Sequence, residues 1–280
     1  MKLVTWNTQW CCGNDGIVSP RRIVEGARAL ADFDVLCLQE IAVNYPRLEG
    51  NAGHDQPALL RELLPGYQQF FGAAVDEWTD AGRQQFGNLI ATRLPVVQVQ
   101  HHPLPYPADG GVRSMPRIVT VVTVRDPALG PVRVMTTHLE FYSKRQRIAQ
   151  AAALRDLHRQ LAAHATAPPE PSDDGSPFQS KVHTDRAILC GDFNLEPHEP
   201  EYAAITEPGA GGQLWDSWRL LHGETPHEPT FRLHDRRYGP EPIACDFVFV
   251  SDALKDKVRR IAIDSTTQAS DHQPVLVELS

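Results

Sequence analysis

The stretch RAILCGDFN, residues 186–194, decides how the rest of this sequence is interpreted. Its first half is apolar and typical of a short buried strand, and its second half places Asp192 and Asn194 where that strand ends. Because side chains alternate along an extended chain, both polar groups should point to the same side. Gly191 has no Cβ and allows a substrate or another backbone to approach closely. Alone, the segment predicts only a turn. Other polar segments that end apolar runs make it a candidate site.

Short apolar runs on both sides of this segment predict a layered α/β protein. Residues 2–7 and 34–38 are predicted strands that flank a helix, with Ser19 as its N-cap and Pro20 in its first turn. Later strands at close spacing indicate antiparallel hairpins. The remaining predicted elements are helices over 58–64, over 141–164 with an apolar stripe that includes Ile148, and near 200–206, and strands over 67–74, 86–92, 96–100, 117–124, 132–137, 186–190, 245–250, 257–263 and 274–279. Two similar α/β halves facing each other sheet to sheet are consistent with this order.

Length and composition set broad limits on the class of protein. The chain has 280 residues, 41% hydrophobic and 22% charged, which is enough apolar material for a sizeable core. We expect one domain over residues 1–280, with a polar, proline-rich and mobile insertion loop over 165–184. The net charge of -8 argues against tight, non-specific binding of nucleic acid. A nuclease is still compatible with that charge, because a bound divalent cation supplies local positive charge.

Cysteine usage and hydropathy indicate the compartment. The 5 cysteines are odd in number, scattered and without a C-x-x-C pair, so neither a disulfide scaffold nor a structural zinc site is predicted. The N-terminal residues do not form a signal-peptide core, and no apolar run approaches the length of a membrane span. We therefore expect a cytoplasmic protein without a membrane span, and nothing indicates an obligate protein partner.

Six polar segments end or begin apolar runs and form the candidate site. Their acidic and amide oxygens, without cysteine ligands, suit a hard cation such as Mg²⁺ or Mn²⁺. Their two histidines, near carboxylates, suit proton transfer and charge stabilisation. No Gly-x-Ser-x-Gly turn is present, so activated water attacking a phosphorus centre fits better than a serine or cysteine nucleophile. The segments are Asn7, Gln39-Glu40, Thr137–Glu140, Asp192–Asn194, Asp246 and Asp271-His272.

Each of these residues also has a simpler interpretation. Glu40 could form a surface salt bridge, His138 could be a structural histidine, and Asp271-His272 could be a turn. Asp246 differs because it lies inside an apolar run, where an ionised carboxylate needs a partner. We therefore predict that Asp246 pairs with His272.

Taken together and in order, the segments resemble the endonuclease/exonuclease/phosphatase superfamily, which includes DNase I, exonuclease III-type AP endonucleases, neutral sphingomyelinases and inositol-polyphosphate 5-phosphatases. The resemblance implies a DNase I-like, four-layer α/β/β/α sandwich, with two mixed, mainly antiparallel sheets face to face and helices outside. It also implies a metal-dependent phosphoric ester hydrolase. The matching segments are TWN at 5–7, LQE at 38–40, THL at 137–139, GDFN at 191–194, DFVFVS at 246–251 and SDHQP at 270–274.

The resemblance further implies a role for each metal-site residue and for the group that activates water. Glu40 would be the principal ligand of Mg²⁺, for which Mn²⁺ could substitute, with Asn7 and Asp271 beside it. Asp192 would orient or deprotonate the attacking water.

The phosphate would be held by a second group of residues. Asn194 would bind a phosphate oxygen, and His272, oriented by Asp246, would stabilise the developing charge. His138 would lie on the far side of the phosphate as a donor or leaving-group acid. Arg117 is a further candidate for holding the phosphate.

Departures from the family pattern narrow the expected activity. The THL segment replaces the Tyr-x-x-Asn of exonuclease III-type enzymes, which argues against an AP endonuclease. Ala244 stands where the family usually has an arginine before Asp246, so that ion pair is missing. We expect hydrolysis of a phosphodiester in nucleic acid, in a small phosphorylated molecule or in a lipid headgroup, by in-line attack of water. The alternatives are a phosphomonoesterase and a non-catalytic binding module.

Overall fold

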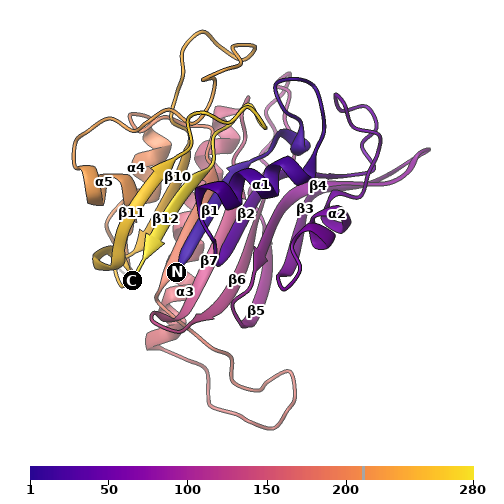
Figure 1. The fold of residues 1–280 in the computed structure, drawn as a ribbon. Coiled ribbons are helices and arrows are strands. Elements are labelled where there is room, and N and C mark those ends of the chain that lie inside the picture. The colour runs from indigo at the N-terminus through magenta and orange to yellow at the C-terminus, as the bar shows by residue number, and fades with distance from the viewer. Residues whose placement is uncertain (210–211) are drawn as a thin grey trace.

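Two six-stranded sheets pack face to face in this computed structural model, which describes residues 1–209 and 212–280 (Figure 1). The first sheet combines the start and the end of the chain, so the two termini lie near each other. Its strands, in spatial order, are β11 (Val258–Ile263), β12 (Val275–Leu279), β1 (Lys2–Asn7), β2 (Val35–Val43), β4 (Gly82–Thr92) and β3 (Gln68–Thr79).

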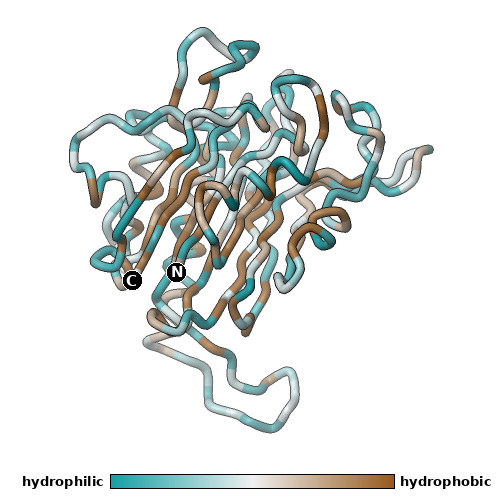
Figure 2. Tube along the Cα trace, viewed as in Figure 1, coloured by the Kyte–Doolittle hydropathy of each residue, from teal (hydrophilic) through white to brown (hydrophobic). Residues whose placement is uncertain are grey.

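The second sheet is built from the middle of the chain. Its strands, in spatial order, are β5 (Val96–Pro103), β6 (Ile118–Asp126), β7 (Gly130–His138), β8 (Ala187–Asp192), β10 (Asp246–Ser251) and β9 (Leu214–Asp216). The main core lies between the sheets, where Leu3 and Val35 of the first sheet belong to the same buried cluster as Val134 and Ile188 of the second. Apolar residues accordingly concentrate along the strands, and polar residues concentrate in the loops (Figure 2).

Helices cover the outer face of each sheet and complete the four layers. Helices α1 (Pro20–Leu30) and α2 (Gln56–Leu63) cover the first sheet, and α3 (Lys144–Thr166) and α4 (Pro200–Thr206) cover the second. Ser19 caps α1 as predicted, because its hydroxyl accepts a hydrogen bond from the backbone N–H of Arg22. The short elements are η1 (Gln9–Cys11), α5 (Ser217–His222) and η2 (Lys255–Lys257). The predicted four-layer sandwich is confirmed.

One edge of the sandwich collects the strand ends that carry the polar motifs. Strands β1 and β2 are parallel, as are β7 and β8, so the carboxyl ends of each pair lie together. Strands β12 and β10 run antiparallel to β1 and β8, which brings the residues at and before their amino ends to the same edge. Carboxyl ends of parallel strands are the usual place for a ligand in α/β sheets. The connection between α3 and β8 lies at the opposite edge (Figure 1).

Several sequence predictions need correction. The strand predicted over 34–38 continues to Val43, through a bulge between Leu38 and Ile41. In α3, Ile148 is 46% exposed, and the buried face includes polar residues such as Gln150, whose Oε1 accepts a hydrogen bond from the backbone N–H of Glu140. The spacing of apolar residues predicted the wrong buried face of the helix, because polar side chains also pack inward where buried backbone groups need hydrogen-bond partners. The prediction also missed β9 and α5.

Other predictions concern the cysteines, the insertion loop and the membrane. All five cysteines are buried free thiols. Helix α3 continues to Thr166, and the loop between it and Ala187 is largely exposed; its mobility stays a prediction. In the part of the chain that the structure describes, no helix combines the length and apolarity needed to cross a bilayer.

Candidate active site

A pocket of about 290 Å³ opens at the edge where the motif-bearing strand ends meet. Both sheets contribute to it through the loops that leave or enter their central strands. Seven of the residues predicted from the sequence line this pocket together: Glu40, Arg117, His138, Asp192, Asn194, Asp271 and His272. Distant segments of the chain therefore form one acidic site that also holds two imidazoles.

Asp192, the last residue of β8, is the centre of the site and is buried. Its Oδ1 accepts a hydrogen bond from the backbone N–H of Asn194 (2.9 Å), and its Oδ2 accepts one from the side-chain amide of Asn7 (2.8 Å). The Nε2 atoms of His138 and His272 lie 3.4 and 3.6 Å from the same Oδ2. Burial raises the pKa of Asp192 to about 6, although the positive charge of His272 opposes this shift. A carboxylate with such a pKa is ionised at neutral pH and can still accept a proton.

His272 is held between two carboxylates. Its Nδ1 lies 2.9 Å from Oδ2 of Asp246, an oxygen that also accepts a hydrogen bond from the hydroxyl of Thr230 at 2.6 Å. The ring of Phe231 stacks on the imidazole, with 4.2 Å between centroids and 17° between planes. Burial by itself would lower the pKa of His272, but Asp246 and Asp192 outweigh it and raise that pKa to about 10. The two carboxylates therefore favour the imidazolium form of His272, and the predicted contact with Asp246 is confirmed.

His138, the last residue of β7, is a neutral histidine. Burial, followed by the charge of Arg117, holds its pKa well below the usual value. Its Nε2 lies 2.9 Å from Nδ2 of Asn194 and accepts a hydrogen bond from it, so Nδ1 carries the proton and faces Oε1 of Glu40 at 3.9 Å. The same Nδ2 donates its other hydrogen to the carbonyl oxygen of Leu139 (2.9 Å). Asn194 must therefore release one of these partners to bind a phosphate oxygen in the predicted way.

Glu40 lies in the bulge of β2 with a φ of 60°, a left-handed conformation that costs energy for a residue with a Cβ. Its Oε1 accepts a hydrogen bond from the side-chain amide of Asn7 (3.1 Å). The amide oxygen of Asn7 instead accepts a hydrogen bond from the backbone N–H of Gln9 (3.1 Å). In this structure Asn7 positions the carboxylates of Glu40 and Asp192 as a donor. Its role as a metal ligand stays a prediction.

The carboxylates of Glu40 and Asp271 both line the pocket and repel each other electrostatically. Burial, followed by the negative charge of Asp271, raises the pKa of Glu40 to about 7. Burial also raises the pKa of Asp271. Among residues 1–209 and 212–280, neither carboxylate has a lysine or arginine within ion-pair distance. Carboxylate oxygens without a positive side chain are the donor set that Mg²⁺ and Mn²⁺ prefer.

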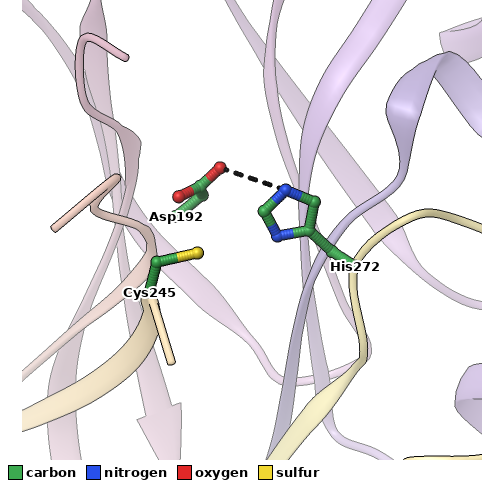
Figure 3. A group of neighbouring side chains, drawn as sticks. All are labelled: Asp192, Cys245 and His272. Carbon is green, nitrogen blue, oxygen red and sulfur yellow. Dashed lines mark ion pairs between the residues drawn. The ribbon is translucent and has the colours of Figure 1, made fainter. Parts of the chain in front are cut away.

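A second group could hold a metal by distance alone. Ligand atoms of Asp192, Cys245 and His272 all lie within 4.8 Å of one another (Figure 3). Metal binding would need a thiolate and an unprotonated imidazole nitrogen. Burial, followed by the charge of Asp246, raises the pKa of the Cys245 thiol well above its usual value, and Asp246 and Asp192 raise the pKa of His272. Without a metal this group therefore favours its protonated form, whereas Glu40 and Asp271 offer the oxygen ligands that Mg²⁺ and Mn²⁺ prefer.

Arg117 occupies a different position from an ordinary surface arginine. It is buried beside the pocket, and its Nε donates a hydrogen bond to Oε2 of Glu140 at 3.1 Å. Its Nη1 is buried and has no hydrogen-bond partner within the described residues. Glu140 therefore neutralises the charge of this candidate phosphate-binding residue, and the N–H groups of Nη1 are left without a partner among the described residues.

Comparison with known proteins agrees with this geometry. Residues 4–272 match the model of the Endonuclease/Exonuclease/phosphatase family. The chain belongs to this family. Members of the endonuclease/exonuclease/phosphatase family are phosphoester hydrolases and generally use a divalent metal, and their fold is the DNase I-like sandwich described above.

Solved structures with the same fold differ in sequence. An endonuclease/exonuclease/phosphatase from Beutenbergia cavernae is 26% identical, with a TM-score of 0.66 over 100% of this chain and 72% of that chain. A mannosyl-6-phosphatase from Bacteroides thetaiotaomicron is 21% identical, with a TM-score of 0.69 over 100% and 99% of the two chains. Truncated TDP2 from Caenorhabditis elegans is 17% identical, with a TM-score of 0.63 over 100% and 97%. A search of curated proteins gives no match.

Two residues that support the site were not predicted from the sequence. Thr230 donates a hydrogen bond to Asp246, and Phe231 stacks on His272. Phe231 lies in a loop, but it forms isolated β-bridges with both Ile243 and His272, so its backbone is paired as it would be in a strand. These residues belong to no recognised motif and follow no regular spacing, which left no signal in the sequence.

Proposed function

We propose that this endonuclease/exonuclease/phosphatase family member hydrolyses a phosphodiester by in-line attack of water. One observation carries the proposal: Oδ2 of the buried carboxylate Asp192 lies 3.4 Å from Nε2 of His138 and 3.6 Å from Nε2 of His272, in a pocket that also holds the carboxylates of Glu40 and Asp271. A proton acceptor, a positive donor and a cation-binding pair within one pocket are the groups that phosphoryl transfer requires.

The residues have distinct parts in this proposal. Asp192 orients the water and accepts its proton, since it lines the pocket and its Oδ2 lies close to Nε2 of both histidines. His272, oriented by Asp246, donates to a phosphoryl oxygen as negative charge develops. His138 carries its proton on Nδ1 and contacts the phosphate from its own side of Asp192, with Asn194 holding the ring. Arg117 offers Nη1 as a further donor.

Glu40 and Asp271 would hold the divalent metal, Mg²⁺ or Mn²⁺. The metal, when bound, neutralises negative charge on the phosphate and so lets the anionic substrate enter an acidic pocket. Asn7 keeps the carboxylate of Glu40 in place through its 3.1 Å hydrogen bond.

The charge of the pocket favours a diester over a monoester. Four carboxylates line it, those of Glu40, Glu140, Asp192 and Asp271, and only Glu140 has an arginine partner, Arg117, among the described residues. A phosphodiester carries one negative charge and a monoester close to two, so repulsion is weaker for the diester. Phosphomonoester hydrolysis remains the second candidate, because a neighbour of the same fold is named a mannosyl-6-phosphatase.

The test compares bis-p-nitrophenyl phosphate with p-nitrophenyl phosphate, with Mg²⁺ or Mn²⁺ and with EDTA. We expect faster hydrolysis of the diester, loss of activity in EDTA and its recovery when metal is added back. Plasmid DNA, RNA and sphingomyelin in the same panel separate the substrate classes, and binding of a nucleic acid should weaken steeply with salt. Hydrolysis that is unaffected by EDTA would refute metal dependence, and no hydrolysis of any phosphoester would refute the proposal.

A further inference from the structure

The geometry points to a substrate in which a planar aromatic ring is attached to the phosphate. The inference rests on the phosphoesterase function proposed above and names the class of group that this pocket selects. It is carried by four aromatic residues, called here the aromatic strip: Phe231, Tyr238, Phe141 and Tyr142.

The aromatic strip is continuous from His272 outward. Phe231 stacks on His272, and its ring centroid lies 6.1 Å from that of Tyr238. Tyr238 and Phe141 follow at 6.2 Å, and Phe141 and Tyr142 at 4.8 Å with an edge-to-face angle of 87°. All four rings line the pocket. A ring attached to a phosphate beside His272 would therefore contact aromatic side chains along the whole length of the aromatic strip.

Exposure shows that core packing does not explain the outer part of the strip. Phe231 is 4% exposed, but Tyr238 and Tyr142 are 44% and 49% exposed. Within the described part of the chain, neither phenol hydroxyl forms a hydrogen bond with the protein, so neither ring is anchored by its polar end. Two tyrosines that face a pocket with free ring surface are what a stacking ligand requires.

The charges around the strip favour an uncharged ring over an extended polyanion. The guanidinium of Arg113 lies over the ring of Tyr142, 5.5 Å from its centroid, and Arg113 has no carboxylate partner among the residues that the structure describes. The other lining arginine, Arg117, is paired with Glu140. One free arginine cannot balance several phosphates in a pocket where three further carboxylates, those of Glu40, Asp192 and Asp271, have no lysine or arginine partner among the described residues.

The size of the pocket agrees with a single ring. A volume of about 290 Å³ lies at the lower end of the range for small-molecule sites, which is roughly 300–1,000 Å³. Trp10 and Phe86, from loops and strands of the first sheet, also line it, so an inserted ring meets aromatic groups contributed by both sheets. Aromatic pairs gain energy beyond their buried area through edge and face contacts, which a saturated ring lacks.

The experiment uses three phosphinates that carry one negative charge and no ester bond: methyl(phenyl)phosphinate, cyclohexyl(methyl)phosphinate and dimethylphosphinate. Their Kd values are measured by calorimetry in Mg²⁺ for the wild-type protein and for the double variant Tyr142→Leu/Tyr238→Leu. Leucine keeps an apolar side chain but removes the ring face. The control is Trp78→Leu, because Trp78 is 80% exposed at the end of β3 and does not line the pocket.

We expect the wild-type protein to bind the phenyl compound roughly 3- to 10-fold more tightly than the cyclohexyl compound. The double variant should lose this preference and keep its affinity for dimethylphosphinate, while Trp78→Leu should behave as wild type. Equal binding of the phenyl and cyclohexyl compounds, or a preference that survives in the double variant, overturns the inference but leaves the phosphoesterase site standing. If dimethylphosphinate also fails to bind and no phosphoester is hydrolysed, the proposed function fails with it.

Discussion

Gly191 links the register of the second sheet to the geometry of the site. Its φ is 138°, and a Cβ added there would lie 1.9 Å from the carbonyl oxygen of Thr137 on the neighbouring strand β7. Ordinary contact begins at 3.4 Å, so Gly191→Ala must separate the two strands locally by the difference, about 1.5 Å. The next residues along these strands are His138 and Asp192, whose Nε2 and Oδ2 atoms are 3.4 Å apart.

A separation of this size should reduce both activity and stability. Misplacement of reacting groups by about 1 Å costs about 100-fold in rate, so kcat/KM should fall by about that factor. The unfavourable φ and the overpacking should together lower the free energy of unfolding by about 2–6 kcal/mol. Because domains have about 5–15 kcal/mol in total, a folded fraction remains for assay.

The assay measures kcat/KM for bis-p-nitrophenyl phosphate in Mg²⁺, at a temperature where urea titration shows the variant to be folded. The matched control is Gly110→Ala, since a Cβ added at Gly110 meets no atom within 4 Å and this loop glycine has no left-handed φ. The control should match wild type in both measurements. Wild-type kcat/KM and an unchanged urea midpoint in Gly191→Ala would refute the link between strand register and catalysis.

Three further changes test the site and its surroundings. Asp246→Asn removes the negative charge beside Nδ1 of His272. The loss of one preorganised donor costs about 100- to 1,000-fold, so kcat/KM should fall by that factor while the circular dichroism spectrum remains native. Glu40→Gln keeps the side-chain size but removes a charge from the carboxylate pair, so the Mg²⁺ concentration for half-maximal activity should rise at least about tenfold. His158 is buried on α3, and burial is the main cause that lowers its pKa to about 4. The positive charges of Arg133 and Arg159 also lower this pKa, whereas the negative charges of Asp252 and Asp185 raise it. Because the folded protein resists protonating His158, its contribution to the free energy of unfolding is complete above pH 6.5 and falls by about 3 kcal/mol as the pH drops toward 4. His158→Gln should remove that part of the pH dependence in urea titrations.

Each of these expectations has a result that contradicts it. Wild-type turnover in Asp246→Asn would show that His272 does not need its carboxylate. An unchanged Mg²⁺ requirement in Glu40→Gln would move the metal away from this residue. Parallel stability curves for wild type and His158→Gln between pH 6.5 and 4 would mean that the buried imidazole binds a proton without unfolding cost.

Much of the architecture was predictable because the patterns behind it are local. Apolar runs bounded by Gly and Pro placed nearly all the strands, and Ser19-Pro20 marked the start of α1. Errors fell where tertiary contacts outweigh pattern. The bulge at Glu40 lets β2 continue where a polar pair suggested its end, and α3 buries Gln150 while it exposes Ile148, because the backbone beneath it needs a hydrogen-bond partner.

The sequence by itself determined the family, the order of the six motifs and the residue types of the site, since each motif lies within a few consecutive residues. Only the tertiary structure decided which atoms meet. Asn7 and Asp192 are 185 positions apart, yet they share a 2.8 Å hydrogen bond, and the aromatic strip joins loops that no motif connects. Such contacts depend on sheet register and on the packing of two sheets, which are properties of the whole fold. No short stretch of sequence contains that information.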